Sequence, residues 1–216
     1  MTVSGTDADS DADSGQELYF RVEGQMSETP TREDAWALLT EYTDNPSLIK
    51  HALGVEAAMR AYAQSYGEDE EMWATIGLIH DFDYQQNPTE ETHLHVGTGI
   101  LRERGWPEEW VRIVASHADF MGVPRDSRAA KTLFAVDELS GFLTACALVR
   151  PDKAIAEVKV KSVKKKLKDK AFARGVNRED VRNGAEELAV DLGEHIEFVR
   201  DAMATIADQL ELPPPE

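Results

Sequence analysis

The chain has 216 residues, a length that suits one domain with tails, and 42% of its residues are apolar, as in ordinary globular proteins. Its formal net charge of −18 excludes nonspecific binding to nucleic acid or to an anionic membrane as an expected role, because like charges repel. The single cysteine, Cys146, excludes an internal disulfide and a thiolate zinc cluster within one chain, and we expect it to be a buried core residue.

The two ends of the chain are predicted to be tails. Residues 1–26 are rich in Asp, Ser and Gly and have almost no periodic apolar pattern, which predicts a disordered acidic tail. The same segment lacks the basic and apolar regions of a secretory signal, and no apolar run in the chain reaches the roughly 18 residues of a transmembrane helix. We therefore expect a cytoplasmic protein without a membrane partner. Residues 212–216 form the second predicted tail, which contains three prolines.

Between the tails, apolar residues recur at three- and four-residue spacings, which predicts helices. The first predicted helix runs from Thr31 to the breaker Asn45-Pro46, and the fifth begins at Pro107, where a missing N–H costs nothing. The other helices are predicted at about residues 47–66, 70–81, 91–104, 127–149, 152–157, 159–173, 178–190 and 193–210. Strand-like alternation is nearly absent, so the predicted fold class is all-α.

We predict a single helical bundle with a C-terminal helical extension. Residues 27–150 would form the metal-binding core described below, and residues 151–211 would pack on the same domain. The last helix has an apolar face, formed by Ile196, Val199, Met203, Ile206 and Leu210. This face could pack inside the domain or across a homodimer, and the sequence leaves both alternatives open.

Two aspartates lie where an unpaired charge would be unfavourable. Asp81, in the pair His80-Asp81, closes the apolar run 73–79, and Asp137 lies within the apolar stretch 133–139. Together with a distant histidine, His51, they suit a divalent metal, because imidazole nitrogen and carboxylate oxygen are ligands of Mn, Fe, Co, Ni, Zn and Mg. The alternative is a set of separate buried His–Asp hydrogen bonds, each of which would need its own structural explanation.

The order His51 … His80-Asp81 … Asp137 resembles the HD superfamily of metal-dependent phosphohydrolases. The resemblance covers about residues 47–150. It extends to the segments 51–56, 78–81, 93–97 with Ile100-Leu101 (the family's His-x-x-x-Gly-x-x-Ile-Leu segment), 113–117 and 137–141. The chain departs from the best-known subgroup because Phe82-Asp83, not Ile-Gly, follows the His-Asp pair. The part after residue 150 resembles a small single-domain subgroup of HD hydrolases.

The resemblance implies a site with one or two divalent metal ions. A single-metal site would use His51, His80, Asp81 and Asp137, whereas a two-metal site would add His93 and His117, with Asp81 bridging. The implied activity is that of a phosphomonoesterase or phosphodiesterase, which hydrolyses a nucleotide or other small phosphate ester through metal-activated water. Asp81 would help to orient the water. His93 or His117, where it is not a ligand, would transfer protons.

Two other functions remain open at this point. Some proteins that resemble this ligand set are di-iron oxygenases that act on small organophosphonates or polyols, and they also need His93 and His117. A non-enzymatic metal-binding interaction protein is the third alternative. Asp83 and Asp119 each lie two positions past a proposed ligand, and we expect them either to orient histidines or to be helix-end charges.

Phosphate recognition requires cations, and the segment 159–170 contains seven lysines in an otherwise acidic chain. Lys164 and Lys168 are four residues apart and are predicted to share one face of a helix. A local basic patch would attract an anionic substrate, so we predict that Lys164, Lys168 and Arg150 bind a small phosphorylated substrate. The alternative is that these lysines form only a solvated helix face. His195 is predicted to be structural.

Overall fold

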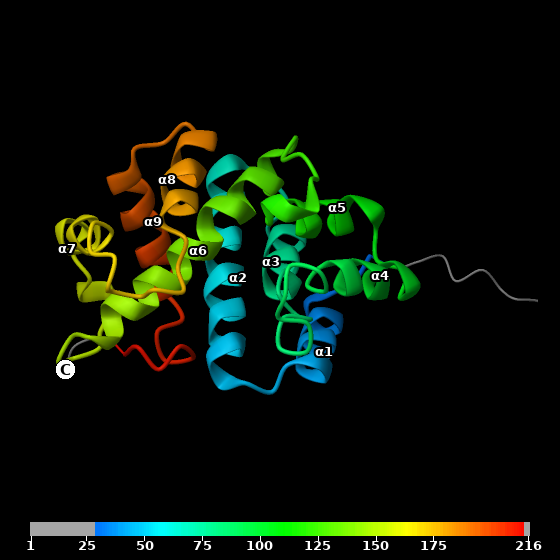
Figure 1. The fold of residues 1–216 in the computed structure, drawn as a ribbon, viewed down its shortest axis with the longest axis horizontal. Helices are drawn as coiled ribbons and strands as arrows, with labels where there is room; N and C mark the ends of the chain where they lie inside the picture. Colours follow the sequence, from blue (N-terminus) through cyan, green and yellow to red (C-terminus); the bar gives the residue numbers. More distant parts are fainter. Residues whose placement is uncertain (1–28, 214–216) are drawn as a thin grey trace, which may run out of the picture.

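The computed structural model describes residues 29–213, so the predicted tail 1–26 lies outside the described residues, as does most of the second tail. Every regular element within 29–213 is helical, which confirms the all-α class (Figure 1). The elements are α1 (Arg32–Tyr42), α2 (Pro46–Tyr66), α3 (Glu70–Ile79), α4 (His95–Glu103), α5 (Glu108–Ser116), the 3-10 helix η1 (Asp119–Met121), α6 (Arg128–Leu148), the 3-10 helix η2 (Ile155–Glu157), α7 (Val160–Lys166), α8 (Arg178–Glu187) and α9 (Leu192–Ala204).

Local capping explains where the helices begin and end. Thr31 accepts a hydrogen bond from Asp34 N–H, and the Asp34 side chain accepts one from the backbone of Thr31, which closes a capping box at the start of α1. Asn45 caps α2, and Pro46 occupies its first position. Gly67 ends α2 in the left-handed region with φ of 69°, a conformation that glycine adopts without strain. These boundaries agree with the breakers identified in the sequence.

Two helices of 21 residues each, α2 and α6, cross in the centre and connect the two sides of the bundle (Figure 1). Helix α2 packs against α3, α6 and α9, while α6 also packs against α5 and α8. Their contact surfaces are apolar, and α6 alone buries Leu133, Val136, Leu139, Phe142 and Leu143. Burial of this apolar area is the main force that holds the bundle together, at roughly 25 cal/mol per Å². The predicted division of the chain at residue 150 stays a prediction.

Several helices are shorter than predicted. The helix predicted at residues 152–157 is only the 3-10 helix η2, and α8 ends at Glu187 rather than near residue 190. Helix α4 begins at His95 rather than near residue 91, because Leu94 has φ of 60° and cannot continue a right-handed helix. Helix α7 ends at Lys166 rather than near residue 173, and turns follow it. Helix α9 ends at Ala204, after which the chain continues as turns with hydrogen bonds between residues three apart. Irregular turns of this kind leave no periodic signal in the sequence.

The apolar face of α9 packs internally. Ile196 and Val199 are fully buried, and Met203 is 1% exposed. Beyond the helix, Leu210 is 4% exposed, although it now lies in a turn. This face therefore does not require a homodimer to cover it, and a homodimer stays a prediction. Cys146 is buried, as expected. None of the helices in residues 29–213 combines the length and the apolarity needed to cross a membrane.

Candidate metal centre

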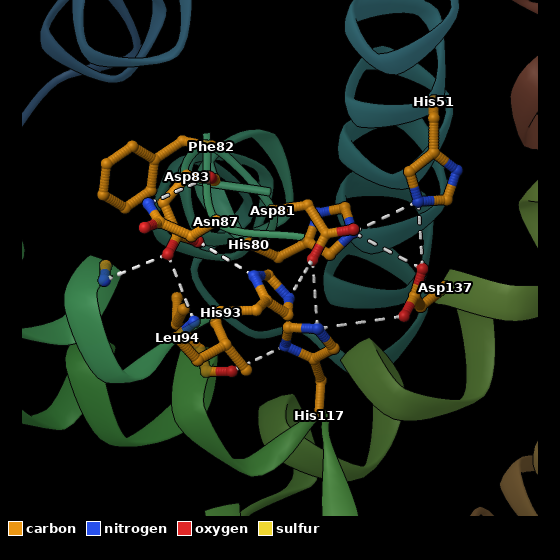
Figure 2. A network of polar contacts seen from close by, with 12 residues as sticks. His51, His80, Asp81, Phe82, Asp83, Asn87, His93, Leu94, His117 and Asp137 are labelled. Carbon is orange, nitrogen blue, oxygen red and sulfur yellow. Dashed lines mark hydrogen bonds and ion pairs between the residues drawn. The ribbon is translucent and has the colours of Figure 1, made fainter. Parts of the chain in front are cut away.

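Five segments far apart in the sequence bring imidazole and carboxylate groups to one point of the bundle (Figure 2). They are α2 with His51, the end of α3 with His80 and Asp81, the turn before α4 with His93, the end of α5 with His117, and the middle of α6 with Asp137. All six residues were predicted from the sequence as metal ligands, and the structure brings all six together. Their role as ligands is taken up as a proposal below.

The first group joins His51, His80, Asp81 and Asp137, each of which offers a ligand atom within 4.8 Å of the others. His51 Nε2 lies 3.0 Å from Asp137 Oδ1 and 3.2 Å from His80 Nε2. His80 Nε2 lies 3.4 Å from Asp137 Oδ1 and 3.6 Å from Asp81 Oδ2. Two imidazole nitrogens and two carboxylate oxygens therefore face one small volume, which is a donor set that suits a divalent metal.

The second group joins Asp81, His93 and His117. The other oxygen of Asp81, Oδ1, lies 3.1 Å from His93 Nε2 and 3.2 Å from His117 Nε2. Asp81 therefore offers one oxygen to each group, as a bridging carboxylate would. The two groups also approach each other at His117 Nε2 and Asp137 Oδ2, which are 4.0 Å apart.

The outer ring nitrogens of three histidines are held by other groups. Nδ1 of His80 lies 2.7 Å from the Gly77 carbonyl oxygen, and Nδ1 of His117 lies 2.6 Å from the Val114 carbonyl oxygen. Nδ1 of His93 lies 3.0 Å from Asp83 Oδ1. Because a carbonyl or carboxylate oxygen can only accept, Nδ1–H donates in each pair, and Nε2 of the neutral ring presents a lone pair towards the centre. The histidines are thus held in the tautomer that binds metal.

Asp83 orients His93 and the turn before α4 that carries it. Of the two roles predicted for Asp83, the structure therefore supports the orientation of a histidine. Its side chain is fully buried and, besides the bond to His93, accepts backbone N–H bonds from Leu94 at 3.2 Å and Gly97 at 3.1 Å. A Cβ at position 97 would lie 2.7 Å from Asp83 Cγ, so only glycine fits there. The positive φ of Leu94, 60°, is a strained conformation that costs about 1–3 kcal/mol and is stabilised by these bonds.

Asp119 has the other predicted role, that of a helix-end charge, because it begins the 3-10 helix η1. Its side chain is 70% exposed and pairs with Arg125 at 2.7 Å. Its ion pair joins η1 to Arg125, which also binds Glu187 of α8 at 2.7 Å. Asp119 therefore helps to hold the loop after His117 and forms no ion pair with a described histidine.

The cluster creates an environment that favours positive charge. Burial by itself would raise the pKa of the Asp81 carboxyl, but the charge of His80 and the close imidazoles of His117 and His93 hold it well below its ordinary value. Burial would lower the pKa of His93, but the neighbouring carboxylates of Asp81 and Asp83 raise it to about 9. The pKa of His80 is raised in spite of complete burial, mainly by the charge of Asp81. Buried imidazoles that gain protons indicate a site that stabilises a cation.

One atom supports a metal rather than a set of hydrogen bonds. Asp81 Oδ1 is buried and accepts no hydrogen bond from any described residue, although His93 Nε2 and His117 Nε2 lie within 3.2 Å. Buried carboxylate oxygens almost always have a hydrogen-bond partner. An oxygen and two imidazole nitrogens that converge without donor–acceptor alignment fit a metal ion bound among them. The residues present therefore fit the divalent metal that the resemblance implies.

A cavity of about 500 Å³ opens over the second group, and Asp81, His93, His117 and Asp137 lie in its floor. Its walls include three aromatic rings, Tyr84, Phe120 and Phe134, and four carboxylates outside the cluster, Glu90, Asp119, Glu138 and Asp180. His51 and His80 do not line the cavity. A ligand in the cavity would therefore meet the second group first.

The three predicted substrate-binding residues do not line this cavity. Arg150 lies beyond the end of α6, whose residues from Asp137 to Leu148 already span about 17 Å, and it pairs with Asp152 at 2.7 Å. Lys164 pairs with Asp191 at 3.8 Å. Lys168 follows the end of α7, so it does not share a helix face with Lys164. The geometry favours the alternative that these lysines belong to a solvated surface.

Three cavity residues, Glu138, Asn177 and Asp180, were not predicted from the sequence. Glu138 had a usable signal, because it adjoins Asp137 within an apolar stretch. Asn177 and Asp180 belong to the start of α8, which reaches the cavity only because α8 packs on α6. No local pattern marks such a long-range contact. His195 is structural, as predicted: its ring links Tyr62 Oη at 2.6 Å to the Ala135 carbonyl at 2.9 Å.

A His/Asp cluster on a helical bundle, with Asp81 shared by two ligand groups, defines a protein of the HD type. Comparison with protein families confirms this class, because residues 48–141 match the model of the HD domain. The matched segment contains all six residues of the cluster, so residues 48–141 of the chain form an HD domain. Comparisons with curated proteins and with solved structures find no match.

Proposed function

We propose that this protein is a metal-dependent phosphohydrolase, a phosphomonoesterase or phosphodiesterase, that acts on a small phosphate ester or nucleotide. The observation that carries the proposal is the position of Asp81, whose two oxygens face two separate ligand groups at the floor of a cavity. His51, His80, Asp81 and Asp137 would hold one divalent metal ion, and His93 and His117 would hold a second with Asp81 between them. Its metal would be Mn, Fe, Co, Ni, Zn or Mg.

A divalent metal bound here would supply a water of lowered pKa and a Lewis acid for a phosphoryl oxygen. The protein's own residues prepare the site for this chemistry. Hydrogen bonds from His80, His93 and His117 to their outer partners keep each ring in place. Asp81 would orient the water near its otherwise unpartnered oxygen. Where only the first group is loaded, His93 would act in proton transfer, with Asp83 fixing its ring.

An HD-type di-iron oxygenase is a second candidate, and one observation favours it. Neither lysine nor arginine lines the cavity within the described part of the chain, although both are the usual partners of phosphate. A polyol fits this absence best, since an organophosphonate is an anion like a phosphate ester, and either substrate would need both ligand groups. A non-enzymatic metal-binding protein would bind metal without turning over either kind of substrate. A cytoplasmic location belongs to the proposal in all three cases.

Metal reconstitution followed by two assays separates these functions. The chain is loaded with Mn, Fe, Co, Ni, Zn or Mg and tested for phosphate release from a panel of mono- and diesters, and the iron form is tested for oxygen consumption with organophosphonates and polyols. Phosphate release that is lost in Asp81→Asn supports the hydrolase. Oxygen consumption by the iron form without phosphate release would replace the hydrolase with the oxygenase.

A further inference from the structure

The wall of the cavity carries carboxylates that have no countercharge. Glu138 of α6 and Asp180 of α8 both line the cavity and are both partly buried. Neither forms an ion pair with another described residue, and Asp180 has no side-chain hydrogen bond to any part of 29–213. The Glu138 carboxyl has a backbone N–H, that of Asn177, as its hydrogen-bond donor. Burial raises the pKa of Asp180, as expected for a carboxylate that lacks a partner.

Arg125, whose charge acts on Asp180, already has partners of its own. Arg125 binds Asp119 at 2.7 Å and Glu187 at 2.7 Å, and its guanidinium lies 3.7 Å from the centre of the Phe134 ring. The guanidinium of Arg125 therefore already has two carboxylate partners, and these ion pairs hold the loop after His117 against α8. Asp180 and Glu138 therefore remain on the cavity wall as carboxyl groups that form no ion pair with another described residue.

Two exposed aromatic rings line the same cavity as these carboxyl groups. Tyr84 is 39% exposed and Phe120 is 40% exposed, and both line the cavity. Their ring centres lie 5.1 Å and 6.2 Å from that of His93, which places them next to the second ligand group. An aromatic face attracts a cation, and a carboxylate accepts hydrogen bonds from an ammonium group. The combination is the chemistry that recognises an amine.

We propose that the substrate carries an ammonium group beside the group that the metal centre holds, so that its class is an aminoalkyl ester. Asp180 and Glu138 accept hydrogen bonds from the ammonium, while Tyr84 and Phe120 cover its methylene or methyl groups. This inference rests on the proposed function for the ester part of the substrate. The ammonium part is independent of hydrolysis, because binding of an amine needs no reaction. The absence of lysine and arginine from the described cavity wall agrees with it.

Ligand-observed NMR with the full chain loaded with Zn²⁺ tests this inference through binding alone. The probes are ethanolamine and choline, each compared with a neutral analogue of similar shape, ethylene glycol and 3,3-dimethylbutan-1-ol. Wild type should bind each amine at least about tenfold more tightly than its analogue. Asp180→Asn should remove most of that preference. Glu103→Gln, a substitution of an exposed acid outside the cavity, should leave it unchanged.

Two results would overturn the inference. One is equal binding of the amines and their neutral analogues by wild type, and the other is an unchanged preference in a folded Asp180→Asn/Glu138→Gln double variant. Failure of the proposed function looks different, because it would appear as amine binding without phosphate release from any ester, including phosphoethanolamine. In that case the amine site stands and the hydrolase does not. Faster turnover of phosphoethanolamine than of ethyl phosphate supports both.

Discussion

Two regions of this protein concentrate charge, and they differ in what surrounds that charge. At the metal centre, His80 is fully buried, and His93 and His117 are 5% and 7% exposed. In the lysine-rich segment 159–170, by contrast, most ammonium groups belong to exposed residues. The first region is built on helices whose other residues form the apolar core. The second lies on the short helix α7 and the turns that follow it.

The difference shows why only one of the two regions could be interpreted reliably from the sequence. A charge within an apolar stretch must find a partner, because an unpaired buried charge is strongly unfavourable, so Asp81 and Asp137 indicated a site before any geometry was known. A lysine on a solvated face is stable without a partner. Its position relative to a distant site depends on tertiary packing, and here that packing leaves Lys164 and Lys168 off the cavity wall.

The largest expected effect comes from removing the shared carboxylate. Asp81→Asn should weaken Zn²⁺ binding by at least about a hundredfold, because it takes a charged ligand from both groups at once. Competition with a chromogenic chelator measures the affinity, and circular dichroism should show unchanged helicity. Glu103→Gln, a change of an exposed acid outside the cavity, is the control and should retain the wild-type affinity. Unchanged affinity in Asp81→Asn would remove the metal centre from this position.

A smaller effect is expected one step away from the ligands. Asp83→Asn should weaken metal binding by about 10–100-fold, because an amide would orient the His93 ring less firmly than the carboxylate does. Binding of a metal ion to the second group should be weakened more than binding to the first. At intermediate metal concentrations the variant should therefore hold one ion per chain where wild type holds two. Equal losses from both groups would mean that Asp83 serves the fold in general rather than His93 in particular.

Two glycines of α4 differ in the space around them: an added Cβ would be crowded at Gly97 but not at Gly99. Gly97→Ala should lower the free energy of unfolding by about 1–3 kcal/mol, because the new Cβ would lie 2.7 Å from Asp83 Cγ. A Cβ at Gly99, two residues further along α4, would meet nothing within 4 Å, so Gly99→Ala should be neutral or stabilising by up to about 1 kcal/mol. Urea denaturation of both variants provides the comparison. A Gly97→Ala variant as stable as wild type would show that Asp83 can move freely.

The carboxylate on the cavity wall should have a modest, pH-dependent effect on stability. Burial and the charge of Asp119 raise the pKa of Asp180, so the folded protein binds more protons than the unfolded chain just above the ordinary Asp pKa. Stability is then lost as the pH rises through that window. Asp180→Asn should therefore gain stability relative to wild type at pH 7 but not at pH 4, by less than about 1 kcal/mol. Thermal melts in the presence of chelator measure it, and a gain at pH 4 alone would contradict the sign.

The smallest effect is expected in the lysine-rich segment. Lys164→Glu combined with Lys168→Glu should change the KM for a phosphate ester by less than about twofold at physiological salt, because exposed charges more than a Debye length of about 8 Å away are largely screened. Steady-state kinetics at low and at physiological ionic strength provide the test. A large rise in KM would return these lysines to the substrate-binding role that the sequence predicted for them.

Local chemistry made much of this fold predictable. Asn45, Pro46 and Gly67 mark helix ends through hydrogen bonds and conformations that involve only neighbouring residues. The six residues of the cluster were also predictable, because residue type, apolar context and the resemblance to HD proteins agreed. The strained φ of Leu94 was not, since it results from bonds to Asp83, eleven residues earlier. Asp180 was not either, because only the packing of α8 on α6 brings it to the cavity.

The most direct test of the metal centre is elemental analysis of the full chain, purified without chelator or affinity nickel and again after soaking in Mn, Fe, Ni or Zn. The proposed function predicts one or two divalent ions per chain, because two groups of residues could each hold one. Two ions would mean that His93 and His117 act as ligands beside the first group, and one would mean that the four-residue group is loaded alone. A chain that binds no metal under any of these conditions would contradict the account.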